Sequence, residues 1–190
     1  GKWHSSDLLA AMRLLVSDRT VMDGLETGMA RLGSTLLRLA HWQHRNTRTG
    51  SRRNIHAHYD LGDALFSLFL DPSMMYSAAV FPRAEATLEE ASRHKLDLIC
   101  RKLELQPDDH LLEIGTGWGG LAIHAARHYG CRVTTTTISE NQFSFARQRV
   151  QEAGLADRIT VLSQDYRDLQ GQFDKLVSVE MIEAVGHGFM

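Results

Sequence analysis

The hydrophobic residues in the first part of this chain recur with a helical period. Met22, Leu25 and Met29 stand three or four positions apart, which places them on one side of a helix. Thr87 followed by Glu90 forms a capping-box signature at the start of another helix. The pattern predicts helices over residues 6–17, 20–42, 61–70 and 88–103, with a polar linker over 46–54.

The pattern changes after residue 109, where short apolar runs alternate with helical segments. The predicted strands are Leu111–Ile114, Arg132–Ile138, Ile159–Leu162 and Lys175–Val179. The predicted helices between them are Gly120–Tyr129 and Glu140–Ala153. Strands that alternate with helices predict an α/β fold, in which right-handed crossovers join the strands of a parallel sheet.

Composition and cysteine usage narrow the class of protein. The chain has 190 residues, 43% of them hydrophobic and 23% charged, which is typical of a globular domain. Cys100 and Cys131 form no C-x-x-C pattern, so we expect reduced thiols and a cytoplasmic protein without a metal site. No apolar run is long enough to cross a bilayer, and any membrane contact should be peripheral.

A basic stretch interrupts an otherwise balanced charge distribution. No acidic residue occurs between Glu26 and Asp60. Arginines in that interval are Arg31, Arg38, Arg45, Arg48, Arg52 and Arg53. The stretch could attract anionic phospholipid headgroups or nucleic acid, or it could be a solvated linker. Of these partners we favour the anionic membrane and expect no nucleic acid.

A glycine-rich turn follows the first predicted strand. Gly115, Gly117 and Gly120 satisfy G-x-G-x-x-G, a spacing that lets the backbone turn tightly and approach a nucleotide cofactor. A dinucleotide site would require an acid about 20 residues further on, but the second strand ends in threonines. Glu113 would repel a pyrophosphate and complement the ammonium and sulfonium groups of S-adenosylmethionine. The charge logic therefore favours S-adenosylmethionine over a dinucleotide.

Six motifs give the chain a resemblance to the cyclopropane-fatty-acid synthase and mycolic-acid methyltransferase family over residues 54–185. They are His58–Gly62, Leu70–Pro72 with Met75–Ser77, Glu113–Gly120, Thr137–Gln142, Gln164–Asp168 and Phe173–Val179. The resemblance implies a class I S-adenosylmethionine-dependent methyltransferase with a Rossmann-like sheet. It divides the chain into a helical N-terminal segment (1–50) that could end a preceding domain, a helical cap (51–109) and the first half of the methyltransferase domain (110–190).

The resemblance also implies a set of cofactor-binding residues. Tyr76 and Ser77 would close over the methionine portion, and the turn would pass beneath it. The turn contributes Glu113, Gly115, Thr116, Gly117 and Gly119. Thr137, Ile138 and Gln142 would hold the ribose and adenosine region, and Asp165 and Tyr166 would flank the adenine. Val179 is a further expected cofactor-binding residue. Thr137 could instead be an ordinary strand residue, and Tyr166 an aromatic ring packed under a loop.

Two positions carry the catalytic expectation. Glu183 matches the glutamate that anchors a bicarbonate ion in the family, although it could be a solvated residue after a strand, as could Glu180. Tyr59 belongs with His58 and Asp60 to a polar cluster near the predicted cofactor entrance, for which a structural hydrogen-bond network is the alternative.

One departure from the family bears on the product. Many members have a cysteine after the Tyr-Ser pair, whereas this chain has Ala78. An alanine side chain offers no polar contact to an anion, so bicarbonate binding could be weakened or absent, and the product could be methyl-branched or methylene-bearing instead of a cyclopropane.

The predicted function is transfer of a methyl or methylene group from S-adenosylmethionine to the double bond of unsaturated acyl chains of phospholipids. The enzyme would work in the cytoplasm, peripheral to the inner face of the membrane, and could form a homo-oligomer. Alternatives are a C-methyltransferase that acts on another lipid or a small molecule, and a non-catalytic S-adenosylmethionine-binding module. The predicted strands are fewer than a complete sheet of this class has. We therefore expect a C-terminally truncated, catalytically weak chain whose last strand exposes apolar surface.

Overall fold

The computed structural model describes residues 7, 9–10, 13 and 63–181. The chain divides into two compact units, residues 1–45 and 46–190. In the first unit, Leu9, Ala10 and Arg13 are helical, and the backbone amide of Ala10 donates a hydrogen bond of 2.8 Å to Asp7 Oδ1. The rest of the predicted helix 6–17 and all of the predicted helix 20–42 lie outside the described residues, as do the basic stretch and the polar linker.

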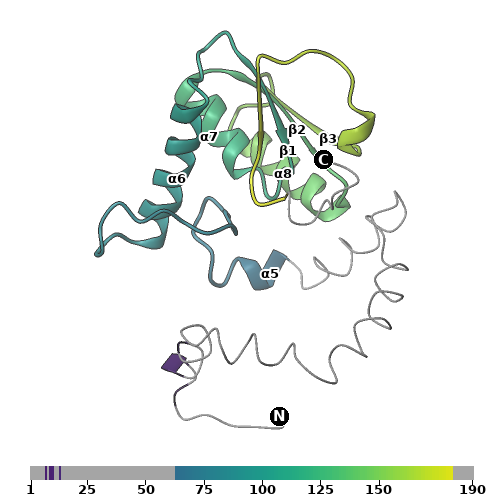
Figure 1. Ribbon diagram of the computed structural model, residues 1–190. Coiled ribbons are helices and arrows are strands. Elements are labelled where there is room, and N and C mark those ends of the chain that lie inside the picture. The colour runs from purple at the N-terminus through teal and green to yellow at the C-terminus, as the bar shows by residue number, and fades with distance from the viewer. Residues whose placement is uncertain (1–6, 8, 11–12, 14–62, 182–190) are drawn as a thin grey trace, which may run out of the picture. The chain divides into compact units, whose positions relative to one another are not determined.

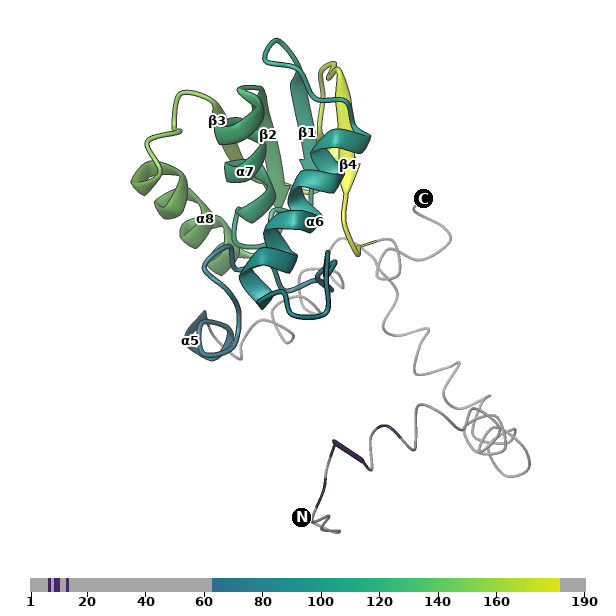
Figure 2. The same cartoon turned by 90° about the vertical axis from the view of Figure 1, so that its left-hand side faces the viewer.

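A parallel four-stranded sheet forms the centre of the second unit (Figures 1 and 2). The strands are β1 (His110–Ile114), β2 (Arg132–Thr137), β3 (Ile159–Ser163) and β4 (Lys175–Ser178), in the spatial order β3-β2-β1-β4. Every neighbouring pair is parallel. The predicted α/β fold is therefore confirmed, and each strand lies within a residue of its predicted bounds at either end.

Three helices accompany the strands. They are α6 (Leu88–Lys102), α7 (Gly120–Tyr129) and α8 (Glu140–Glu152). The crossovers through α7 and α8 step in the same direction across the sheet, so right-handed connections place both helices on one face, where α6 packs against α7 (Figure 2). The hydrophobic core lies between these helices and the strands, and its fully buried members include Leu96, Leu111, Leu121 and Val133.

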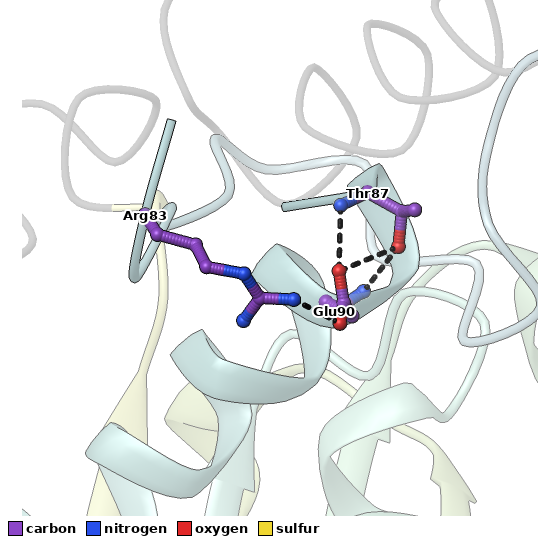
Figure 3. A network of polar contacts seen from close by, with 3 residues as sticks. All are labelled: Arg83, Thr87 and Glu90. Atoms are coloured by element: carbon purple, nitrogen blue, oxygen red, sulfur yellow. Dashed lines mark hydrogen bonds and ion pairs between the residues drawn. The ribbon is translucent and has the colours of Figure 1, made fainter. Parts of the chain in front are cut away.

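Local sequence sets the start of each helix. Helix α6 begins with the predicted capping box: Thr87 Oγ1 accepts a hydrogen bond from the Glu90 amide, and Glu90 Oε2 accepts one of 2.8 Å from the Thr87 amide (Figure 3). Arg83 adds an ion pair of 2.6 Å to the same carboxylate. Helix α8 is capped by Ser139, whose hydroxyl accepts from the Gln142 amide.

The helix predicted over residues 61–70 is wrong in extent. Helix α5 covers only Asp63–Phe66, and residues 67–70 form turns. The amides of Leu68 and Phe69 bond to carbonyls three residues back, at Leu65 and Phe66, instead of four. Leu68 is 82% exposed, so the described residues offer its side chain no burial that would favour extending the helix.

Both cysteines are buried free thiols, as expected from their spacing. Burial raises the pKa of the Cys100 thiol to about 12. Strand β4 lies at the edge of the described sheet with Leu176 58% exposed, which is the apolar exposure expected of the last strand. Among the helices of the described residues, none combines the length and apolar character that crossing a bilayer requires.

Candidate functional site

The glycine turn joins the carboxyl end of β1 to the start of α7. Gly115, Gly117 and Gly119 adopt positive φ angles of 95°, 52° and 82°, a region that residues with a side chain rarely enter. The amides of Gly115 and Thr116 both donate to the carbonyl of Thr136 on β2, at 3.0 and 3.1 Å. The turn is thereby fixed to the ends of two neighbouring strands, at the edge where ligands bind in open α/β sheets.

Residues 71–78 run past this turn and are here called the 71–78 segment. Its start is ordered by Asp71, whose carboxylate accepts hydrogen bonds from the Ser73 amide (2.9 Å) and hydroxyl (3.0 Å). A Cβ added to Gly120 would lie 2.7 Å from the Ser73 carbonyl oxygen, and one added to Gly117 would lie 3.2 Å from Cε1 of Tyr76. The glycines therefore allow the segment to lie directly against the turn.

The contact at Gly120 determines whether Gly120→Ala stabilises or destabilises the protein. Alanine is favoured over glycine in a helix by about 1 kcal/mol, so Gly120→Ala would stabilise a helix start with open space around it. Because the new Cβ meets the Ser73 carbonyl, we expect the free energy of unfolding in urea to fall by about 1–3 kcal/mol instead. Gly154→Ala is the contrasting control, because the added Cβ would meet no atom within 4 Å. The change in its free energy of unfolding therefore reports only the cost of placing a side chain at a positive φ. A stabilised Gly120→Ala variant would contradict the close packing.

Three aromatic rings join the 71–78 segment to the turn. The Tyr76 and Trp118 rings meet edge to face, with centroids 5.1 Å apart and planes at 90°. Phe66 packs on Trp118 at 4.7 Å. Trp118 is 2% exposed, whereas Tyr76 is 44% exposed. The buried indole of Trp118 thus packs against the Tyr76 ring. This ring lies next to Gly117, where the methionine portion of the cofactor is expected.

Arg149 on α8 connects the segment and the turn by hydrogen bonds. Its Nη1 donates to the carbonyls of Ser73 (3.0 Å) and Trp118 (2.8 Å), and its Nη2 donates to the carbonyl of Pro72 (2.8 Å). One guanidinium therefore holds backbone from two segments more than forty positions apart in the sequence. Arg149 was not among the residues predicted from the sequence. The available signal was a cation between Ala146 and Val150, two of the three buried residues of α8.

Lys95 on α6 anchors the far end of the segment and was also missed. The ammonium donates to Ser77 Oγ at 2.6 Å and to Glu180 Oε1 at 3.1 Å. The Glu180 carboxylate also accepts from the Ala78 amide, at 3.2 and 3.4 Å. Glu180 is therefore engaged with other residues of the chain, which corrects the alternative that it is merely solvated. A lysine on the buried face of α6 beside Leu96 was the available signal.

The residues expected to hold the ribose gather where β2 meets α8. Thr137 Oγ1 donates to Gln142 Oε1 at 3.0 Å and accepts from the Ser139 amide at 3.1 Å. Gln142 is 5% exposed, and its Nε2 has no hydrogen-bond partner among residues 63–181. A buried amide donor without a partner is costly, so this group is suited to a ligand oxygen. Ile138, half-buried, lies between the two polar residues in the chain.

Glu113 is deeply buried, which bears on its expected role as a charged partner of the cofactor. It is 4% exposed, pairs with Thr135 on β2 across the sheet, and its Oε2 has no hydrogen-bond partner in the described part of the chain. Burial raises the pKa of the carboxyl to about 8, against which a hydrogen bond with Thr135 acts. The carboxyl is therefore mostly protonated near pH 7, and its complementarity to a cation holds only once the proton leaves. The Thr135 hydroxyl also bonds to that of Thr116, at 2.7 Å.

The Asp165–Tyr166 turn lies at the carboxyl end of β3. Asp165 is buried, and its carboxylate accepts from the amide of Arg167 at 3.0 Å and from its guanidinium at 2.8 and 2.5 Å. Arg167 also lies 5.8 Å from the centroid of the half-buried Tyr166 ring. The turn is tied to β2 by a hydrogen bond from Thr136 Oγ1 to the carbonyl of Gln164. Whether Asp165 and Tyr166 flank an adenine stays a prediction.

The remaining predicted residues divide into two groups. Val179 follows directly after β4, is half-buried and packs against the hydrophobic core, so it lies at the same edge of the sheet as the turn. Tyr59 and Glu183, the two predicted catalytic residues, lie outside the described residues, as do His58 and Asp60. Their roles stay predictions.

A cavity of about 420 Å³ lies between α6 and α7, lined by Arg93, His94, Asp97, His124, His128 and Tyr129. Helix α7 starts at the carboxyl edge of the sheet, so its last residues lie toward the opposite edge. The cavity is therefore separate from the glycine turn. Burial lowers the pKa of His124 to about 4, and Asp97 accepts a hydrogen bond of 2.7 Å from the Tyr129 hydroxyl.

The geometry around the turn can be compared with known proteins. The family model of mycolic acid cyclopropane synthetases matches residues 46–189. The chain belongs to this family. The family named from the six motifs is thereby confirmed.

Individual relatives support the family assignment and show how much of a full-length relative this chain covers. Tuberculostearic acid methyltransferase UfaA1 of Mycobacterium tuberculosis is 39% identical over 194 residues, covering 98% of this chain and 45% of the relative. The cyclopropane-fatty-acyl-phospholipid synthase of Escherichia coli is 50% identical over 129 residues, covering 68% of this chain and 32% of the relative. The chain thus spans less than half the length of the curated relatives that it matches.

A solved structure of the family has the same fold. The mycolic acid cyclopropane synthase CmaA1, solved with S-adenosylhomocysteine (SAH) and CTAB, superposes with a TM-score of 0.69 at 39% identity. The match covers 72% of this chain and 48% of CmaA1. The predicted class I methyltransferase fold is confirmed, and the predicted enzyme class and cofactor agree with the family.

The residues around the turn fit S-adenosylmethionine. Two buried polar atoms, Glu113 Oε2 and Gln142 Nε2, have no hydrogen-bond partner within residues 63–181. Glu113 lies on β1, directly before the glycine turn, and Gln142 lies in the first turn of α8. One is an acid that can face a cation, and the other is a donor that can face a ribose oxygen. The site thus offers both kinds of group that the cofactor requires.

Proposed function

We propose that the protein binds S-adenosylmethionine at the glycine turn and transfers a one-carbon group from it to the double bond of unsaturated acyl chains in phospholipids. The observation that carries the proposal is the buried Gln142 Nε2, which has no hydrogen-bond partner among residues 63–181 and lies where β2 meets α8, at the same edge of the sheet as the glycine turn. Membership of the cyclopropane synthetase family supplies the lipid chemistry.

The chemistry explains what the residues must do. S-adenosylmethionine supplies a methyl group carried on a positively charged sulfur. An alkene is a weak nucleophile, so the site has to exclude water and tolerate positive charge on the acyl chain. Tyr76 over the buried Trp118 provides an apolar wall with an electron-rich face. Glu183 would hold the group that removes the final proton.

A methyl-branched or methylene-bearing product is the second candidate, and one residue favours it. Ala78 stands where many family members have a cysteine, and its amide bonds to Glu180. The methyl side chain of Ala78 offers no polar contact to an anion such as bicarbonate. UfaA1, which matches 98% of this chain, is named a tuberculostearic acid methyltransferase.

We further propose that the enzyme works in the cytoplasm at the inner face of the membrane. The support is the basic stretch between Glu26 and Asp60, whose arginines would be attracted to anionic headgroups.

Labelling of cellular lipids tests the proposal. Cells that express the full-length protein are fed methionine with a ¹³C-labelled methyl group, and extracted phospholipids are analysed by mass spectrometry and carbon NMR. We expect label in acyl chains, with NMR separating a ring carbon from a branch, and at least a roughly hundredfold loss of label in Glu183→Gln. Label in a small molecule instead of acyl chains would contradict the substrate class. Absence of any label in a protein that binds SAH would indicate a non-catalytic module.

A further inference from the structure

Lys95 is a buried cation next to the predicted cofactor site. Lys95 is 8% exposed, and its ammonium nitrogen lies 2.6 Å from Ser77 Oγ and 3.1 Å from Glu180 Oε1. Burying an ammonium is costly unless hydrogen bonds and opposite charge compensate for lost water. Both partners lie outside α6, one on the 71–78 segment and the other after β4. The lysine is therefore held at a junction of three parts of the fold.

The contact with Lys95 fixes the direction of the Ser77 hydroxyl. An ammonium can only donate hydrogen bonds, so Ser77 Oγ must accept from Lys95. The hydroxyl hydrogen of Ser77 then remains available for an acceptor on another side. The positive charge behind the oxygen polarises the O–H bond and strengthens its donation. Ser77 is thereby prepared to bind an acceptor, and an anionic one most strongly.

Glu180 keeps the lysine in this position. It accepts the second Lys95 hydrogen bond, and its two carboxylate oxygens also accept from the Ala78 amide. The Glu180 side chain is 46% exposed, whereas that of Lys95 is 10% exposed. Water therefore screens the glutamate more than the lysine, and the positive charge dominates on the buried side.

We propose that Lys95 is a positioning residue that makes Ser77 a selective donor to the carboxylate of the cofactor's methionine portion. The inference rests on the proposed function, because it assumes that S-adenosylmethionine binds at the turn. The carboxylate is the single anionic group of that cofactor. Ser77 is the neighbour of Tyr76, whose ring lies against Gly117. By family resemblance, Tyr76 and Ser77 are the two residues expected to close over the amino-acid portion of the cofactor.

The test measures selectivity in place of affinity alone. Calorimetry gives the dissociation constants of the full-length protein for SAH and for its decarboxylated analogue, S-adenosyl-3-thiopropylamine. The ratio of the two constants reports recognition of the carboxylate. It is compared among the wild type, Lys95→Met, Ser77→Ala and the double variant. Lys102→Met is the matched control, an exposed lysine on the same helix.

We expect the wild type to prefer SAH, and Lys95→Met to reduce that preference about tenfold, the weight of one charge-assisted hydrogen bond. Ser77→Ala should reduce it similarly, and the double variant no further, because the two residues act through one contact. Glu180→Gln should retain or increase the preference, since it leaves the lysine charge less compensated.

Three outcomes would overturn the inference. One is a Lys95→Met variant that weakens both ligands equally, which would indicate a purely structural lysine. The second is a Ser77→Ala variant with the full wild-type preference, and this result decides the matter even if Lys95→Met does not fold. The third is loss of preference in Lys102→Met. Failure of the wild type to bind either ligand would instead refute the proposed function.

Discussion

Binding of SAH to the full-length protein is expected to release close to one proton at pH 7 and to strengthen about fiftyfold between pH 6 and pH 8. The reason is the Glu113 carboxyl, whose pKa burial raises to about 8. If the cationic amino-acid portion of the ligand binds the ionised form of Glu113, the carboxyl must first lose its proton. The free-energy cost of this deprotonation falls as the pH approaches the pKa of Glu113. Above pH 8 the dependence on Glu113 should level off.

Calorimetry in buffers of different ionisation enthalpy measures the proton release directly. Glu113→Gln is the control, because it retains the shape of the side chain and cannot ionise. Titration of the ligand's own amine is common to both proteins, so only the difference between their pH profiles reports on Glu113. Identical profiles for the wild type and Glu113→Gln would show that this carboxyl does not face the ligand's charge.

The same carboxyl makes the ligand-free protein less stable as the pH rises. Its pKa is about 8 in the fold and 4.5 as the ordinary value, so the folded state holds a proton that the unfolded chain releases. The contribution to stability is complete below pH 4.5 and is lost as the pH rises through 8, by up to about 5 kcal/mol. Urea unfolding of the ligand-free wild type and of Glu113→Gln at pH 5 and pH 8 measures the effect. Only the difference between the two proteins reports on Glu113, because the lowered pKa of His124 makes stability rise over the same pH range.

Replacement of Arg149 by methionine is expected to weaken SAH binding by at least tenfold and to lower the free energy of unfolding by about 3–5 kcal/mol. The variant removes three hydrogen bonds, to the carbonyls of Pro72, Ser73 and Trp118. Those carbonyls then lack the partner that holds the 71–78 segment on the glycine turn. Tyr76 should lose its fixed position over Gly117, which couples the loss of stability to the loss of affinity.

Two further variants make this prediction specific. Arg147→Met removes an exposed arginine of the same helix whose guanidinium lies 5.5 Å from the Phe143 ring centroid, and it should change neither quantity appreciably. Arg149→Lys keeps the charge but loses the planar fork, so it should recover only part of both losses. Calorimetry and urea unfolding measure the two effects. Wild-type affinity in Arg149→Met would show that the contact with the segment is dispensable for the ligand.

Sequence by itself determined the order of strands and helices from residue 110 onward and the glycine turn between the first pair. These features are encoded locally, because hydrophobic period, caps and positive-φ glycines act over a few neighbouring residues. The capping box at Thr87 and the cap at Ser139 are examples, and both are present in the structure. The extent of helix α5 was predicted wrongly from local sequence. The apolar run predicted a helix over residues 61–70, whereas turns follow Phe66 and leave Leu68 exposed.

Only the tertiary structure decided which polar residues act together. Arg149 reaches Pro72 across 77 positions, and Lys95 reaches Glu180 across 85, and no local pattern specifies such pairs. The protonation of Glu113 likewise depends on burial from several elements at once, so a charge argument based on the isolated motif took it as ionised. Local sequence specifies backbone geometry, whereas the burial of a charge and its partner arise only when distant segments pack together.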